Sequence, residues 1–208
     1  MSQLEIRTRS VGPWPMNTYV LVCPETQQSM LIDPGADPDT LAEMLAGTTP
    51  IAILLTHTHP DHVGELAPMR ARLGVPLLAH PGPHHQNMDL GSYQHVGDGE
   101  VIKLGQHQLV AHYGPGHIDD MICFRELNGP TTVVGDTIFA GGPGKTWSAE
   151  GFRTTLQTLQ AVVLAWSDDT ICYAGHGPSF RLGDLRAKIN AFITKPHPAG
   201  FFGDAAWE

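Results

Sequence analysis

Four side chains of the kinds that bind metal ions lie within six residues of one another: His57, His59, Asp61 and His62. Imidazole and carboxylate groups suit zinc, iron or manganese. The cluster follows the apolar run 51–55, which has the length and composition of a buried strand. The alternative is a polar turn with solvated histidines. We favour a metal site, because three more candidate ligands follow downstream in similar contexts.

These three candidates are His117, Asp136 and His176, and each directly follows a glycine. A short apolar segment precedes each of them, so each candidate is expected at the exit of a strand. One Gly-His or Gly-Asp pair usually marks no more than a turn. Strand ends of a layered α/β protein can converge on one edge, where such folds place their sites. The four segments in this order therefore predict one metal centre.

Apolar periodicity predicts an α/β protein with many short strands and four helices. The expected helices cover 37–46, 63–73, 149–166 and 182–193. Ser148 is the expected N-cap of the third helix, with Glu150 in its first turn. The expected strands cover 4–8, 19–22, 30–32, 51–55, 76–79, 101–104, 109–112, 121–124, 132–134 and 170–173.

The composition is typical of one compact domain over residues 1–208, with 41% hydrophobic residues. No apolar run reaches the roughly 18 residues of a membrane span, and residues 1–5 lack the features of a secretory signal. Three cysteines in apolar contexts, Cys23, Cys123 and Cys172, suggest core residues in a reducing compartment. We therefore expect a cytoplasmic protein without membrane contact.

The net charge argues against one class of partner. Twelve basic against 21 acidic residues give −9 at pH 7 with neutral histidines. Nucleic-acid binding requires a basic footprint. The expected partner is a small-molecule substrate, and the sequence carries no signal for an oligomeric state.

The motifs resemble those of metallo-β-lactamase-fold hydrolases. The resemblance rests on His-x-His-x-Asp-His at 57–62, Pro-Gly-His at 115–117, Gly-Asp at 135–136 and Gly-His-Gly at 175–177. Within that superfamily the chain is most similar to the glyoxalase II (hydroxyacylglutathione hydrolase) branch, through 135–139 and the glycine-rich 141–145. The resemblance implies an αββα four-layer sandwich, with two mixed β-sheets face to face and helices on the outer faces.

The resemblance also implies a ligand set for two divalent metal ions, with zinc favoured over iron or manganese. One ion would take His57, His59 and His117, and the other Asp61, His62 and His176, with Asp136 bridging both. Two ions bridged by a carboxylate can share one water, lower its pKa and generate a hydroxide nucleophile. They can also polarise a scissile carbonyl. Asp61 would orient that hydroxide, so Asp61 and Asp136 are the expected catalytic residues.

Lys145 and Trp147 are the candidate substrate-binding residues. In glyoxalase II the lysine of the glycine-rich loop binds a carboxylate of glutathione, and Lys145 lies in a matching loop. The expected substrate is an anionic thioester or a related ester. The alternative for Lys145 is a solvated lysine without a ligand.

Other functions in the same fold are weighed against thioester hydrolysis. A persulfide dioxygenase with a single iron uses only part of the ligand set, so the complete set favours a dinuclear hydrolase. Aspartate at position 136, where the well-known dinuclear lactam-hydrolysing subclass uses cysteine, disfavours a β-lactamase. A lactonase ranks lower as well, and a non-catalytic metal-binding protein is the remote alternative.

Several polar residues have less context. Asp33 is expected to fix a turn. Asp119 and Asp120 either cap a turn, which we favour, or support a neighbouring ligand. His84 and His85 lie in an irregular segment, 81–92, that could form a flap, and they are expected at the surface rather than in a pocket. The aromatic tail 201–208 is expected to pack on the body of the protein.

Overall fold

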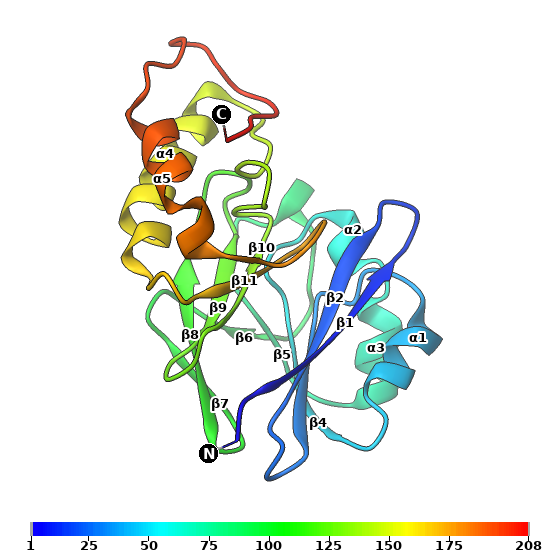
Figure 1. Ribbon diagram of the computed structural model, residues 1–208. Helices are drawn as coiled ribbons and strands as arrows, with labels where there is room; N and C mark the ends of the chain where they lie inside the picture. The colour runs from blue at the N-terminus through cyan, green and yellow to red at the C-terminus, as the bar shows by residue number, and fades with distance from the viewer. Residues whose placement is uncertain (1, 208) are drawn as a thin grey trace.

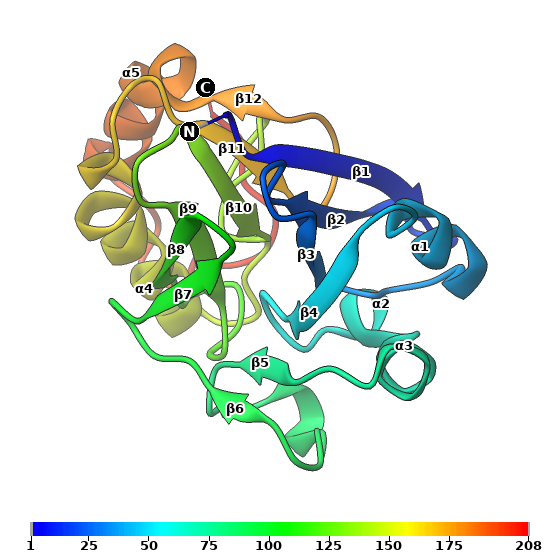
Figure 2. The same ribbon diagram turned by 90° about the horizontal axis from the view of Figure 1, so that it is seen from below.

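The computed structural model describes residues 2–207, so Met1 and Glu208, the ends of the predicted domain and tail, lie outside the described part. Two six-stranded sheets face each other, and helices cover their outer faces (Figures 1 and 2). Both sheets contain parallel and antiparallel pairs. The predicted αββα four-layer sandwich is confirmed.

The first sheet is built from the N-terminal half of the chain. Its spatial order is β1 (Glu5–Val11), β2 (Met16–Val22), β3 (Gln28–Ile32), β4 (Thr49–Leu54), β5 (Leu77–Ala79) and β6 (Gln94–His95). The strands from β1 to β3 pair antiparallel, and those from β3 to β6 pair parallel. Helices α1 (Pro38–Met44) and α3 (Leu66–Leu73) pack on its outer face through Leu41, Met44 and Met69.

The second sheet is built from the C-terminal half. Its spatial order is β12 (Phe180–Arg181), β11 (Ile171–Ala174), β10 (Thr131–Gly135), β9 (Ile122–Glu126), β8 (His107–Tyr113) and β7 (Val101–Leu104). All neighbours are antiparallel except β10 and β11. Helices α4 (Ala149–Ala161) and α5 (Leu182–Thr194) cover its outer face (Figure 1).

Strand β2 of the first sheet packs against apolar residues on both of its faces. All seven of its residues are buried. Successive side chains of a strand point to opposite faces. Tyr19 and Leu21 accordingly join the core between the sheets, whereas Val20 and Val22 join the layer under the helices. Packing on both faces therefore fixes the strand whose first residues lie beside the metal centre.

The predicted elements agree with the structure in place and type, with three differences. Strands β6 and β12 were missed, because two-residue strands carry no apolar period. The helix predicted over 63–73 is two helices, α2 (Pro60–Val63) and α3, separated by Gly64 and Glu65. Pro60 at the first helical position starts α2 early. The helix predicted over 149–166 ends at Ala161, before a short 3₁₀ turn.

Two further expectations are confirmed. The three cysteines are buried and free. The tail packs back on the body: Trp207 is 8% exposed, contacts Phe192 and donates a 3.0 Å hydrogen bond from Nε1 to the carbonyl oxygen of Phe139. Among the described residues, no helix is long and apolar enough to cross a membrane.

The N-cap of α4 generates a prediction about stability. The Ser148 hydroxyl accepts a 3.0 Å hydrogen bond from the Gly151 backbone N–H. Ser148→Ala should lower the free energy of unfolding by about 1 kcal/mol, because that donor loses its partner, whereas Ser148→Asp should retain most of the stability. Urea denaturation measures both. Equal stability of the alanine variant and the wild type would contradict the capping role.

Candidate metal centre

All seven predicted ligands lie at one edge, where the two sheets meet. His57 follows β4, while Asp61 and His62 belong to α2, of which His59 is the N-cap. The remaining ligands come from the second sheet: His117 lies in the loop after β8, Asp136 directly follows β10 and His176 follows β11. The fold therefore places the ends of these distant segments next to one another, as the sequence pattern predicted.

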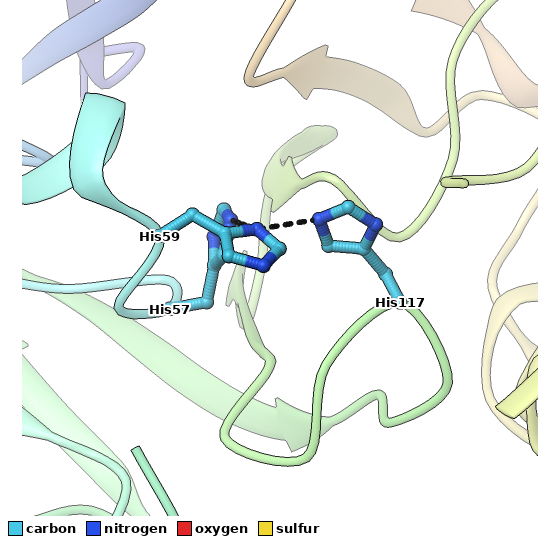
Figure 3. A group of neighbouring side chains, drawn as sticks. All are labelled: His57, His59 and His117. Carbon is cyan, nitrogen blue, oxygen red and sulfur yellow. Dashed lines mark hydrogen bonds between the residues drawn. The ribbon is translucent and has the colours of Figure 1, made fainter. Parts of the chain in front are cut away.

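The first triad, defined as His57, His59 and His117, has its ring nitrogens pointing toward one another (Figure 3). Nδ1 of His59 lies 3.1 Å from Nε2 of His57 and 2.8 Å from Nε2 of His117. All three side chains are buried. Three imidazole nitrogens facing one point are the donor set of a tetrahedral zinc site with an open position.

The outer nitrogens of two of these rings fix their tautomers. Nδ1 of His117 lies 2.6 Å from the Lys145 carbonyl oxygen, which can only accept, so Nδ1 carries the proton. The Thr56 hydroxyl donates to Asp33, so it accepts from Nδ1 of His57 at 3.0 Å. Both Nε2 atoms then present lone pairs toward His59. One proton on His59 could satisfy only one of them, whereas a cation would satisfy both.

The second triad is defined as Asp61, His62 and His176. Oδ2 of Asp61 lies 3.2 Å from Nε2 of His176 and 4.0 Å from Nε2 of His62. The Nδ1 atoms of both rings are engaged outside the triad, with the Asp33 carboxylate at 2.9 Å and the Pro15 carbonyl oxygen at 3.0 Å. Each ring therefore turns Nε2 inward.

Asp136 lies between the two triads. Its Oδ2 is 3.6 Å from Nε2 of His117 and 3.6 Å from Nε2 of His176, and its Oδ1 is 3.5 Å from Nε2 of His62. Oδ1 of Asp136 and Nε2 of His62 are buried without a hydrogen-bond partner. Such orphaned buried atoms are costly. The donor set fits divalent cations, which would satisfy both.

The two triads differ in charge when no ion is bound. Burial, reinforced by the neighbouring histidines, holds the pKa of His57 well below its usual range and lowers that of His59 to about 4. Burial also opposes the charged form of His62, but Asp136 and Asp33 outweigh it and raise the pKa of His62 to about 10. A hydrogen bond to Asp61 raises the pKa of His176. A cation that binds at the second triad must therefore displace protons from His62 and His176. The histidines of the first triad are already neutral, so a cation there displaces no such charge.

The two carboxylates at the centre remain ionised. Burial acts to raise the pKa of Asp61, but the hydrogen bond from His176 and the charge of His62 lower it to about 2. Burial of Asp136 is outweighed in the same way by His62, and the pKa of Asp136 is lowered. Both side chains are therefore anionic near neutral pH and available as ligands.

The close packing of the centre explains why residue 175 is a glycine. A Cβ atom on Gly175 would lie 2.1 Å from Oδ1 of Asp136 and 2.7 Å from Cε1 of His62. No side chain fits there without displacing a ligand. The glycine before His176 thus permits the close approach of backbone to the centre, beyond forming a turn.

Asp33 is the main residue that sequence reasoning interpreted differently. It was expected to fix a turn, yet its carboxylate is 1% exposed and accepts from Thr56 N (2.7 Å), Thr56 Oγ1 (2.6 Å) and His62 Nδ1 (2.9 Å). It orients a ligand from outside the centre. The signal was present, because Asp33 follows β3 as Asp136 follows β10.

Two of the cavities beside the centre are lined by members of both triads. One, of about 500 Å³, is lined by the glycine-rich loop with Lys145, by His117 and His176, and by Asp204 of the tail. The Lys145 ammonium lies 3.2 Å from the Asp204 carboxylate and 5.1 Å from the Trp147 ring centroid. No local pattern marks Asp204 as a functional residue, because it reaches the cavity only through the folding back of the tail.

The second cavity, of about 350 Å³, lies between Trp14 and Trp147 and is also lined by His85 and several ligands. Both indoles are exposed, by 67% and 62%. His85 contacts the His59 ring with centroids 4.9 Å apart, so the irregular 81–92 segment does reach the centre, whereas His84 hydrogen-bonds to the His80 backbone. The surface position expected for His85 is therefore wrong.

Asp119 and Asp120 form the expected turn. Asp120 also has the supporting contact that was held as the alternative. Its Oδ2 accepts a 2.6 Å hydrogen bond from Thr58, which lies between two residues of the first triad. Thr58 in turn accepts from the His85 backbone N–H at 2.7 Å. The turn therefore connects the irregular segment to the loop that carries His57 and His59.

Comparison with known proteins agrees with this architecture. A sequence model of the metallo-beta-lactamase superfamily matches residues 11–176. The chain is 30% identical over 192 residues to a probable metallo-hydrolase, YqgX, of Bacillus subtilis, covering 83% of this chain and 90% of the relative. It is 34% identical over 163 residues to a hydroxyacylglutathione hydrolase of a Polaromonas species, covering 76% of this chain but only 60% of that hydrolase.

A solved structure described as TTHA1623 in a di-iron-bound form superposes with a TM-score of 0.74 at 28% identity, covering 89% of this chain and 99% of that one. Its architecture is thus shared over nearly the whole chain. With the family match over most of the sequence, the chain belongs to the metallo-β-lactamase superfamily, and hydroxyacylglutathione hydrolases are among its relatives.

Proposed function

We propose that this protein is a dinuclear metal-dependent hydrolase that cleaves a thioester or a related ester. The observation that carries the proposal is the position of Asp136, whose two oxygens lie 3.5–3.6 Å from ring nitrogens of both triads. A carboxylate in that position is suited to bridging two cations. The di-iron form of TTHA1623 supports the metal count by similarity.

In the proposed centre, the first triad would hold one cation and the second triad would hold the other. Zinc fits the imidazole-rich donors, and iron or manganese also suits them. Two such cations supply a water of lowered pKa and polarisation of the scissile carbonyl. Asp61, with 23% of its side chain exposed, would accept a hydrogen bond from the attacking water and orient its lone pair. Asp136 keeps both triads in register.

Each of the two cavities would hold a different end of the substrate. The Lys145 cavity would hold the anionic end, while the cavity between Trp14 and Trp147 would hold an apolar group on the other side of the scissile bond. The ion pair of Lys145 with Asp204 is solvent-exposed, so it stabilises the folded protein by only about 0–1 kcal/mol. A substrate carboxylate can therefore displace Asp204. An anionic thioester fits this arrangement.

The assay that tests the proposal compares S-lactoylglutathione with glutathione persulfide. Thiol release without oxygen uptake is expected from the first substrate. Oxygen consumption with the second, without thioester cleavage, would replace the hydrolase by a single-iron dioxygenase. Anomalous diffraction from metal-loaded crystals should locate two ions at the seven residues; one ion there would contradict the dinuclear centre.

Removal of the bridging carboxylate separates chemistry from folding. Asp136→Ala should lose at least one of the two ions and lower kcat by orders of magnitude, because the carboxylate that lies against Nε2 atoms of both triads is removed. The metal-free fold should survive, since the ligands lie at strand exits rather than in the core. Metal analysis and circular dichroism measure these effects. Asp169→Ala, which changes an exposed aspartate in the turn before β11, is the control. Wild-type turnover with two ions in Asp136→Ala would refute the bridge.

Asp33 should tune metal affinity without contacting the ion. Asp33→Asn keeps the side-chain shape but weakens the acceptor of His62 Nδ1–H, and we expect a loss of about 10- to 100-fold in affinity at the second triad. A competition titration with a chelator measures it. Asp39→Asn, an exposed aspartate on α1, should leave the affinity unchanged. Equal affinities in both variants would reduce Asp33 to a turn residue.

Lys145 and Asp204 should act in opposite directions. Lys145→Ala should lower kcat/KM for an anionic thioester by roughly five- to thirty-fold, about 1–2 kcal/mol, mainly through KM. The backbone carbonyl that holds His117 remains in this variant. Asp204→Ala removes the competitor and should lower KM by up to about fivefold.

A neutral thioester of similar reactivity is the control for both variants. Its kinetics should change little, and added salt should shrink the differences seen with the anionic one. Equal losses with both thioesters would mean that Lys145 shapes the loop and does not recognise charge.

A further inference from the structure

A second cluster of ligating side chains lies at the opposite end of the sandwich. Cys23 directly follows β2, Glu25 lies in the next turn and His107 begins β8. One donor atom from each lies within 4.8 Å of the other two. Strand β2 begins beside the catalytic centre, where Asn17 bonds to Gly175. The cluster at its other end is therefore roughly 20 Å away, at about 3.3 Å per residue.

The imidazole of His107 has the surroundings of a metal-binding histidine. Its side chain is 6% exposed, and its Nδ1 lies 2.9 Å from Oε1 of the buried Glu126. Its Nε2 is buried with no hydrogen-bond partner. This nitrogen faces Oε2 of Glu25 at 3.8 Å. A carboxylate behind Nδ1 with a free Nε2 in front is the arrangement that orients metal-binding histidines.

The other two donors are oriented as well. Ser2 donates to Oε1 of Glu25 from its backbone N–H (2.8 Å) and its hydroxyl (2.6 Å), which leaves Oε2 for the cluster. Oε2 lies 3.4 Å from Sγ of Cys23. Tetrahedral zinc with nitrogen, oxygen and sulfur donors has donor–donor separations of roughly 3.3–3.7 Å. The two measured separations, 3.4 and 3.8 Å, are close to that range.

The surrounding backbone and charge favour a cation. Gly105, in the turn before His107, has φ +58°, and a Cβ there would lie 2.5 Å from Sγ of Cys23. This turn of the second sheet can approach Cys23 only through a glycine. Glu126 lies beside the cluster and adds a second carboxylate to that of Glu25, and among residues 2–207 no lysine or arginine forms an ion pair with either.

We propose that Cys23, Glu25 and His107 form a separate site for a thiophilic divalent cation such as zinc. The three donors are a thiolate, a carboxylate and an imidazole, which leave a fourth position for water. An adjoining cavity of about 290 Å³, lined by His107, Glu126 and the Ser2–Gln3 segment, provides room for it. Because Cys23 belongs to the first sheet and His107 to the second, the ion would link the two sheets.

Cobalt(II) distinguishes this site from the catalytic centre. The seven residues of that centre include no sulfur, so a thiolate-to-cobalt charge-transfer band in the near-ultraviolet reports the Cys23 site alone. Titration of the metal-free full chain should give one such band that saturates at one thiolate-bound cobalt per chain. The proposal does not depend on the catalytic activity, because the readout is spectroscopic.

Three variants test the assignment. Cys23→Ser should abolish the band. Cys172→Ser, which changes another buried free cysteine, should leave it intact. Glu25→Gln alters a partly solvent-exposed side chain, so it should fold normally and weaken cobalt binding at this site by at least tenfold. The visible cobalt absorption from the catalytic centre should persist in all three.

Two outcomes would overturn the proposal. One is absence of the band when the catalytic centre is saturated and ten further equivalents of cobalt are present. The other is a band of full intensity in Glu25→Gln or Cys23→Ser. In either case the cluster would be a buried histidine ring bonded to Glu126 that binds no metal.

Discussion

The carboxylate of Asp33 is almost fully buried, yet it accepts three hydrogen bonds, from the backbone and hydroxyl of Thr56 and from the ring of His62. A buried charge without such partners would be strongly destabilising. These partners lie at the end of β4 and in α2, so one side chain after β3 connects the elements that carry four of the seven candidate ligands. Its φ of +53° shows that the backbone accepts a less favourable conformation to place it.

The sequence predicted most of this architecture because the ligand segments repeat one local pattern. An apolar run, a glycine and a ligand are all visible without tertiary information, and His117, Asp136 and His176 were found on that basis. Asp33 directly follows the apolar strand β3 without an intervening glycine, and it was interpreted as a turn residue, since Asp-Pro-Gly is a strong turn signal. The break between α2 and α3 was missed because the apolar residues on either side of Gly64 keep a helical spacing.

Features that depend on the backbone of distant segments could not be predicted. The partners of His117 and His176 outside the centre are carbonyl oxygens of Lys145 and Pro15, and every residue type has such an oxygen. Asp204 reaches Lys145 only because Gly203 and Thr146 pair as an isolated bridge. Two-residue strands such as β12 likewise exist through pairing at a sheet edge, with no local propensity behind them.

The candidate centre also depends on the packing between the sheets. Each triad draws two residues from the first sheet's side and one from the second, and Asp136 comes from the second. Tyr19 and Asn17 of β2 hold this junction, since both donate to the carbonyl oxygen of Ala174 at 2.6 and 3.0 Å, two residues before His176. A relative shift of the sheets by a fraction of an ångström would separate the halves of both triads. Core residues between the sheets therefore set the geometry of the candidate centre, although they belong to neither triad.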